Sequence, residues 1–189
     1  LNRTGIKLTN MEVWNSEYYK TNILKMVREI YEEICGFPHK RDYRDYDDSD
    51  YEKLKTSYAA SIYTEENIKR MLPLDDIIDL CNSLKKKSVE GGSKKELESF
   101  LRLNKTISDK EASEIKSKFR KTLNNLKEIF AKQDLDASIF SKRTHFVSLF
   151  LAIGLLVDKY YMLSDTMKLK EDLLDFIQNQ PDKYKDSVL

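Results

Sequence analysis

The sequence predicts an all-α protein: a multi-helix bundle with a buried apolar helix near residues 142–162. First, hydrophobic residues make up 40% of the chain and charged residues 34%, with only five Gly and three Pro, a composition that favours long, charge-coated helices over loop-rich sheets. Second, apolar residues recur at helical spacing along most of the chain. Third, no stretch alternates between apolar and polar residues for long enough to require a β-strand.

The first helix is predicted to begin near Asn10. Residues 2–5 read Asn-Arg-Thr-Gly and predict a tight turn in which Gly5 takes a positive φ. Thr9 is followed three residues later by Glu12, the spacing of a capping box that closes a helix N-terminus. The apolar stripe of this helix consists of Met11, Trp14 and Tyr18.

A second helix is predicted over residues 23–34. It should end at Gly36 and Pro38, because Gly suits a left-handed cap and Pro cannot continue a helix. Residues 39–51 are mostly charged residues and tyrosines, so we expect an exposed loop there. Apolar residues at helical spacing return with Leu54, Tyr58 and Ile62.

Two helices are predicted on either side of Pro73. Thr64 has the character of an N-cap for a short helix that carries the apolar residues of 68–72. Residues 74–84 then predict an amphipathic helix that ends in three lysines at positions 85–87. Cations are favourable there because the C-terminal end of a helix dipole is negative.

Two more capping boxes open the helices of the second half. Ser93 and Ser108 each precede a glutamate by three residues. Residues 91–92, Gly-Gly, come just before the first of these boxes, and we interpret them as a flexible linker. The second box leads into the most regular helical pattern of the chain, which extends to Phe130.

The last third of the chain predicts a buried helix and an amphipathic one. Residues 134–138 are expected to form a turn. Apolar residues between 140 and 157 then occupy nearly every side of a helix, which is typical of a central, buried position. Residues 169–177 predict a final amphipathic helix that ends before Pro181.

The chain of 189 residues is long enough to bury a substantial core in one domain with an appendage. We divide it into residues 1–20, a junction turn with the first helix; residues 21–162, the helical bundle domain; and residues 163–189, a C-terminal helix and tail.

Composition excludes several classes of protein. Lys and Arg total 33 against 32 Asp and Glu, so the chain lacks the global positive charge that non-specific nucleic-acid binding relies on. Cys35 and Cys81 lie in helical patterns and are expected to be reduced core thiols. The longest uncharged apolar run, residues 146–157, is too short to span a membrane, so we expect no membrane partner and a cytoplasmic location.

Candidate catalytic and metal-binding residues are few. The two histidines, His39 and His145, lie in no recognised catalytic motif, and we expect structural roles for both. The acidic stretch 42–50 fails the calcium-loop pattern, because Asp50 stands where that loop needs glycine and Thr56 where it needs glutamate. We therefore expect no catalytic residue, no metal site, no cofactor and no enzymatic activity of this chain on its own.

Basic residues gather in four clusters, at residues 85–87, 94–95, 116–121 and 142–143. Acidic residues lie on the same predicted helix as the cluster at 116–121, so solvated helix faces explain such clusters. A local stripe facing nucleic acid is the alternative, and both interpretations stay open. The candidate nucleic-acid-binding residues are Lys116, Lys118, Arg120, Lys121, Lys142 and Arg143.

The start of the chain resembles the junction that follows the ParB/sulfiredoxin-like domain in GmrSD-type restriction and anti-phage proteins. The residues that carry this resemblance are Asn2, Arg3, Thr4, Gly5, Glu12 and Asn15. Three later segments resemble the helical region of the same family: residues 68–78, residues 100–104, and residues 140–143 before the apolar residues 149–156. Their order along the chain adds to the resemblance.

The resemblance implies that this chain is the helical region C-terminal to a ParB-like domain. That domain carries an Asp-Gly-Gln-Gln-Arg motif linked to nucleotide hydrolysis, and many members carry a C-terminal HNH-type nuclease domain; neither motif occurs here. We therefore expect a fragment that acts as scaffold and relay, whose partner is the missing N-terminal ParB-like domain of the same protein. DNA and a second copy of the chain are further candidate partners.

Two other functions remain open. The chain could be a stand-alone helical protein-interaction module, or a helical nucleic-acid-binding domain. An Asp-Gly-Gln-Gln-Arg motif encoded upstream of Leu1 would favour the role as the helical region of a GmrSD-like protein. Binding to duplex DNA that weakens steeply with salt would favour a helical nucleic-acid-binding domain.

Overall fold

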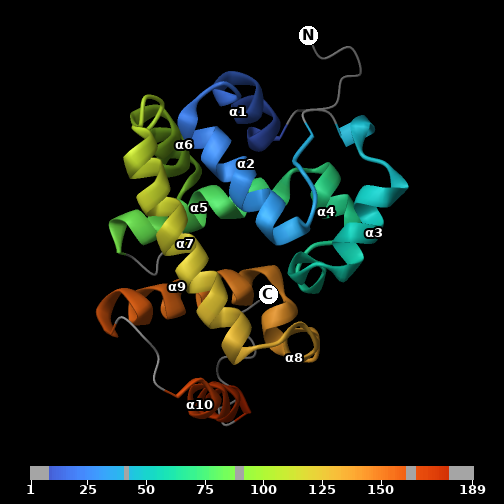
Figure 1. The fold of residues 1–189 in the computed structure, drawn as a ribbon, viewed down its shortest axis with the longest axis vertical. Helices are drawn as coiled ribbons and strands as arrows, with labels where there is room; N and C mark the ends of the chain where they lie inside the picture. The colour runs from blue at the N-terminus through green and yellow to red at the C-terminus, as the bar shows by residue number, and fades with distance from the viewer. Residues whose placement is uncertain (1–8, 41–42, 88–91, 161–164, 179–189) are drawn as a thin grey trace.

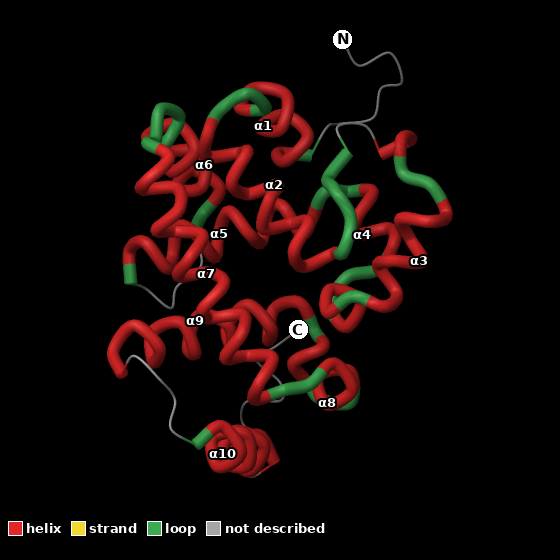
Figure 2. Tube along the Cα trace, in the orientation of Figure 1, coloured by secondary structure: helices red, strands yellow, loops and turns green. Residues whose placement is uncertain are grey.

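The computed structural model describes residues 9–40, 43–87, 92–160 and 165–178. Within them every regular element is a helix and none is a strand, so the prediction of an all-α bundle is confirmed (Figures 1 and 2). The predicted turn at residues 2–5 lies outside the described residues. The α-helices are α1 (Asn10–Tyr18), α2 (Asn22–Cys35), α3 (Asp48–Thr56), α4 (Glu65–Lys69), α5 (Leu72–Lys86), α6 (Lys94–Leu103), α7 (Asp109–Ile129), α8 (Lys132–Asp136), α9 (Arg143–Tyr160) and α10 (Thr166–Gln178).

Local side-chain caps set the start of many of these helices. In a capping box the N-cap side chain accepts from a backbone N–H three residues on, and that residue's side chain accepts from the N-cap N–H. The predicted boxes at Thr9, Ser93 and Ser108 are confirmed, and Thr64 caps α4 as expected. At the other end of α2, Gly36 adopts φ 82° and donates its N–H to the carbonyl of Glu32, as the sequence predicted.

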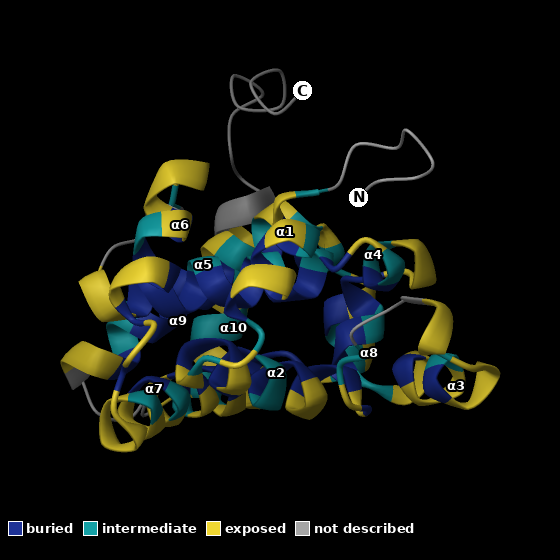
Figure 3. Ribbon diagram, turned by 90° about the horizontal axis from the view of Figure 1, so that it is seen from above, coloured by how far each residue is buried: buried dark blue, intermediate teal, exposed yellow. Residues whose placement is uncertain are grey.

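The core lies where α2, α5, α7 and α9 contact one another. The predicted buried helix is α9, which packs against α7 through Phe150 and Phe119, with ring centroids 4.7 Å apart. In Figure 3 the buried faces lie between a row that includes α1, α5 and α6 and a row that includes α2 and α7. Cys35 and Cys81 lie unbridged within this core.

The prediction of an exposed loop at residues 39–51 is confirmed only in part, because the segment is partly helical. Its exposed residues include Arg44, Asp45, Asp47, Asp48 and Ser49. The 3-10 helix η1 (Tyr43–Asp45) and the start of α3 lie in this segment. Asp47 and Asp50 form a capping box for α3, and the Asp50 side chain is buried beside Lys40, with 2.5 Å between Nζ and Oδ2. Aspartates in this segment cap the start of α3 and bind Lys40, so a high number of charged residues does not by itself indicate a loop.

One smaller expectation also fails. Residues 134–138, expected to be a turn, include the end of the one-turn helix α8, whose Leu135 is buried. Gly92, predicted to belong to a flexible linker, lies in the connection between α5 and α6 and donates its N–H to Asp79 Oδ1 at 2.6 Å. A Cβ at Gly92 would lie 2.7 Å from Leu97, so glycine here permits close packing of the chain against α5 and α6.

The two ends of the helix series lie far apart. In Figure 1, α1 and α10 occupy opposite ends of the long axis of the molecule. The final helix α10 contacts α7, and Lys170 on α10 pairs with Asp134 at 2.6 Å. None of the helices in the described ranges is long and apolar enough to cross a lipid bilayer.

Candidate functional site

The long helix α7 directs its predicted basic residues to two different sides. On one side, Lys116 donates to Glu29 Oε2 at 2.5 Å. One turn further on, the guanidinium of Arg120 binds Glu33 through two nitrogens, with 2.7 Å from Nε to Oε2. Both glutamates belong to α2, so these two cations hold α7 against α2.

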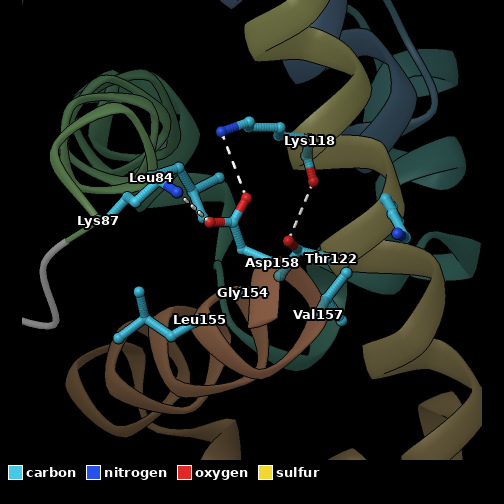
Figure 4. A pocket seen from close by; sticks show the side chains of 9 residues that line it. Leu84, Lys87, Lys118, Thr122, Gly154, Leu155, Val157 and Asp158 are labelled. Carbon is cyan, nitrogen blue, oxygen red and sulfur yellow. Dashed lines mark hydrogen bonds and ion pairs between the residues drawn. The ribbon is translucent and has the colours of Figure 1, made fainter. Parts of the chain in front are cut away.

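On the other side of α7 lies a hollow of about 250 Å³ between α5, α7 and α9 (Figure 4). Asp158 on α9 joins the three helices: its carboxylate lies 2.8 Å from Lys87 Nζ and 3.4 Å from Lys118 Nζ. The hydrogen bond from Lys87 is the largest effect that lowers the pKa of Asp158. We call this site the lysine hollow, and its lining residues are Leu84, Lys87, Lys118, Lys121, Thr122, Gly154, Leu155, Val157 and Asp158.

The lower part of the lysine hollow is apolar. Leu84 and Val157 are 7% and 4% exposed, and Gly154 is buried between them in the close approach of α9 to α5 and α7. The hydroxyl of Thr122 donates to the Lys118 carbonyl at 3.0 Å, so its hydrogen bond is made within α7 and not to a group in the hollow. The hollow therefore combines an apolar floor with ammonium groups at its rim (Figure 4).

The last two predicted basic residues lie apart from this hollow, at the start of α9. Arg143 binds Asp76 on α5 through two nitrogens, at 2.7 and 2.6 Å, and Asp76 also accepts from the Tyr63 hydroxyl at 2.7 Å. The hydrogen bonds to Asp76 raise the pKa of Arg143, and burial is the main cause that raises the pKa of Tyr63. Lys142, the neighbouring residue, is exposed.

The junction residues that carry the family resemblance are only partly described. Asn2, Arg3, Thr4 and Gly5 lie outside the described residues. Glu12 completes the capping box of α1, accepting from the Thr9 N–H at 2.6 Å. Asn15 is 2% exposed, and its Oδ1 has no hydrogen-bond partner among the described residues.

The histidines and cysteines do not converge. Both ring nitrogens of His39 are buried without a hydrogen-bond partner among the described residues, and burial, with a smaller effect of the Arg28 charge, lowers the pKa of His39 to about 4. His145 is half-buried near the start of α9. Burial raises the pKa of both cysteine thiols. In the described part of the chain no group of three or more His, Cys, Asp or Glu side chains could hold a metal ion.

The sequence alone indicated only part of the lysine hollow. It singled out Lys118 and Lys121 as basic, but Lys87 only as a helix-ending cation and Asp158 not at all. No local pattern connects these residues, because they meet only through the packing of three helices. Comparison of the chain with known protein families, curated proteins and solved structures finds no match.

Proposed function

We propose that this chain is a helical scaffold and relay module that follows a ParB-like domain in a GmrSD-like, modification-dependent defence protein. The family in this proposal comes from the resemblance of the junction residues to GmrSD-type proteins. The position of α1 within the core supports the role as a scaffold. In this proposal the chain has no reactive centre of its own. It holds the preceding domain in a fixed position and transmits strain between that domain and the bundle.

The observation that carries the proposal is that α1 is part of the core. Met11, Trp14 and Tyr18 are 2%, 4% and 3% exposed, and α1 contacts both α2 and α5. The corner between α1 and α2 is pinned by Thr21, whose hydroxyl donates to the Tyr18 carbonyl at 2.6 Å, and by Arg28, which donates to the Tyr19 carbonyl at 2.8 Å. A domain that precedes residues 1–8 would therefore be followed by a helix that is packed into the core.

A continuous set of contacts leads from α1 into the bundle. Helix α2 contacts α1 at one end and is tied to α7 by two ion pairs, from Lys116 to Glu29 and from Arg120 to Glu33. Helix α7 in turn packs on α9. Rigid helices joined in this way can carry a displacement from one end of the bundle to the other.

The experiment begins with the reading frame that precedes Leu1. We expect it to encode a ParB-like domain with an Asp-Gly-Gln-Gln-Arg-type motif. The longer protein should hydrolyse nucleotide, and its rate should depend on the outer face of α1. Val13 is the apolar residue of that face, 45% exposed, so Val13→Lys should lower the rate several-fold by disturbing the packing of the preceding domain.

Met167→Lys is the matched control. Met167 is also apolar and exposed, at 76%, but it lies on α10 at the other end of the molecule (Figure 1). Both variants should unfold at the wild-type temperature, because both side chains are solvent-exposed in this chain. An upstream frame without a ParB-like motif, or equal hydrolysis by the two variants and the wild type, would count against the proposal.

A further inference from the structure

The lysine hollow has the chemistry of a binding site for an amphipathic anion. Its floor is formed by the buried side chains of Leu84 and Val157 with Gly154 between them, and its rim carries lysine ammonium groups. A surface hollow that joins apolar walls with a few polar groups is the common form of a small-molecule site. Its volume of about 250 Å³ limits the ligand to a small one.

Among the residues that the structure describes, the rim has more positive charge than its one carboxylate balances. Asp158 is shared by Lys87 and Lys118, so this triad keeps a net charge of +1. Each ammonium has three N–H donors, and one contact with Asp158 leaves the others available. The side chains of Lys87 and Lys118 are 65% and 47% exposed, so an anion can reach them from solvent.

The charge of the rim indicates the type of anion. Lysine binds phosphate as a point charge, and a phosphate monoester carries about two negative charges at pH 7, so two ammonium groups are a better match for it than for a carboxylate with one charge. The lysine hollow has lysines and no arginine. The arginine of the same helix, Arg120, faces the other way and binds Glu33.

We propose that the lysine hollow binds a small phosphate monoester, with its phosphate at Lys87 and Lys118 and its apolar group against Leu84, Gly154 and Val157. The phosphate would compete with Asp158 for the two ammonium groups. Asp158 therefore weakens binding and tunes it, while the apolar floor adds affinity that inorganic phosphate cannot obtain. This site needs no preceding domain, so its test is separate from that of the proposed relay.

Calorimetric titration of the whole chain with phenyl phosphate at low salt tests the site. We expect a dissociation constant of about 1 mM or tighter, with inorganic phosphate about tenfold weaker because it lacks the apolar group. Lys118→Ala and Lys87→Ala should each weaken phenyl phosphate about tenfold. Asp158→Asn should strengthen it several-fold, an effect that a purely structural role of the carboxylate does not produce.

Lys110→Ala is the matched control, because it removes one exposed lysine from α7 away from the lysine hollow and should leave the affinity unchanged. Lys118→Gln provides a second variant that removes the charge but keeps a polar side chain, and it should weaken phenyl phosphate as Lys118→Ala does; melting curves verify that each variant is folded. No phenyl phosphate binding up to about 10 mM would overturn the proposal. So would equal affinity for inorganic phosphate, equal losses in Lys110→Ala and Lys118→Ala, or weaker binding by folded Asp158→Asn.

Discussion

The side chain of Arg143 lies between α9 and α5, where its charge is used within the fold. Asp76, its main partner, is 5% exposed, and a buried carboxylate that loses its cation is costly to leave unpaired. We expect Arg143→Ala to lower the free energy of unfolding by about 2–3 kcal/mol in urea titrations. Lys142→Ala removes the adjacent exposed cation and should leave the unfolding curve nearly unchanged. Similar small effects of both substitutions would contradict the structural role of Arg143.

Gly154 is required for the close approach of α9 to α5. A Cβ at this position would lie 2.6 Å from Leu84 Cδ2 and 3.4 Å from Thr122 Oγ1. Alanine gains roughly 1 kcal/mol of helix propensity, but overpacking costs about 1–3 kcal/mol. We expect Gly154→Ala to destabilise the wild type by about 1 kcal/mol and to be neutral or stabilising when Leu84 is also Ala, because the clash is then removed. Equal effects in both backgrounds in a thermal double-mutant cycle would exclude this contact as the cause.

At the scale of elements, the sequence predicted what local chemistry determines. The starts of α1, α6 and α7 follow from a Ser or Thr placed three residues before a Glu, and the end of α2 follows from Gly36. The short helices α3 and α8 were missed, because each has few apolar residues. Helix α8 also packs against residues 58–61, which are distant in sequence. The buried Leu54 and Leu135 belong to the common core, a property that no local window contains.

The N-cap of α3 gives a prediction for this missed helix. Asp47 Oδ1 accepts from the Asp50 N–H at 3.1 Å, and the Asp50 side chain accepts from the Asp47 N–H at 3.2 Å. We expect Asp47→Ala to lower the free energy of unfolding by about 1 kcal/mol, the usual cost of losing such a cap. Ser49→Ala, an exposed position in the first turn of the same helix, is the control for urea unfolding. A cost no larger than that of Ser49→Ala would mean that α3 does not depend on this cap.

At the scale of the whole molecule, the predicted basic stripe is divided between two faces of α7. Its partners lie far away in sequence, since Lys116 and Glu29 are separated by 87 residues, as are Arg120 and Glu33. Sequence reasoning could identify the cations but not the carboxylates that face them after folding. Sequence reasoning could not identify the lysine hollow for the same reason, because the hollow forms where three helices meet.

Because the basic residues of α7 lie on two different faces of the helix, we expect the chain to bind DNA weakly. The net charge is only +1, and ion pairs with α2 occupy Lys116 and Arg120. Fluorescence anisotropy with a labelled duplex at low salt should give a dissociation constant weaker than about 10⁻⁴ M, the weak end of non-specific binding. The double variant Glu29→Gln, Glu33→Gln should bind more tightly, because it releases both cations. Micromolar binding by the wild type with a steep salt dependence would instead favour a nucleic-acid-binding function.

His39 links the stability of the whole molecule to pH. Its ring packs edge-on against Tyr31, with centroids 5.3 Å apart, and its buried nitrogens have no hydrogen-bond partner in the described part of the chain, so the folded protein favours the neutral imidazole. The pKa of His39 is about 4 when folded, against about 6.5 when unfolded. Between these values the unfolded chain holds a proton that the folded chain lacks, so stability falls as the pH falls from 6.5 towards 4 and this loss ends below 4.

His39→Phe isolates this effect, because phenylalanine keeps a ring against Tyr31 and no hydrogen bond of the imidazole is lost. From pH 7 to pH 5, urea unfolding should show the wild type losing about 2 kcal/mol more than His39→Phe. Carboxylates titrate in both proteins, so only the difference between the two slopes reports on His39. Parallel curves for the wild type and His39→Phe would show that the imidazole is already protonated or exposed in the folded state.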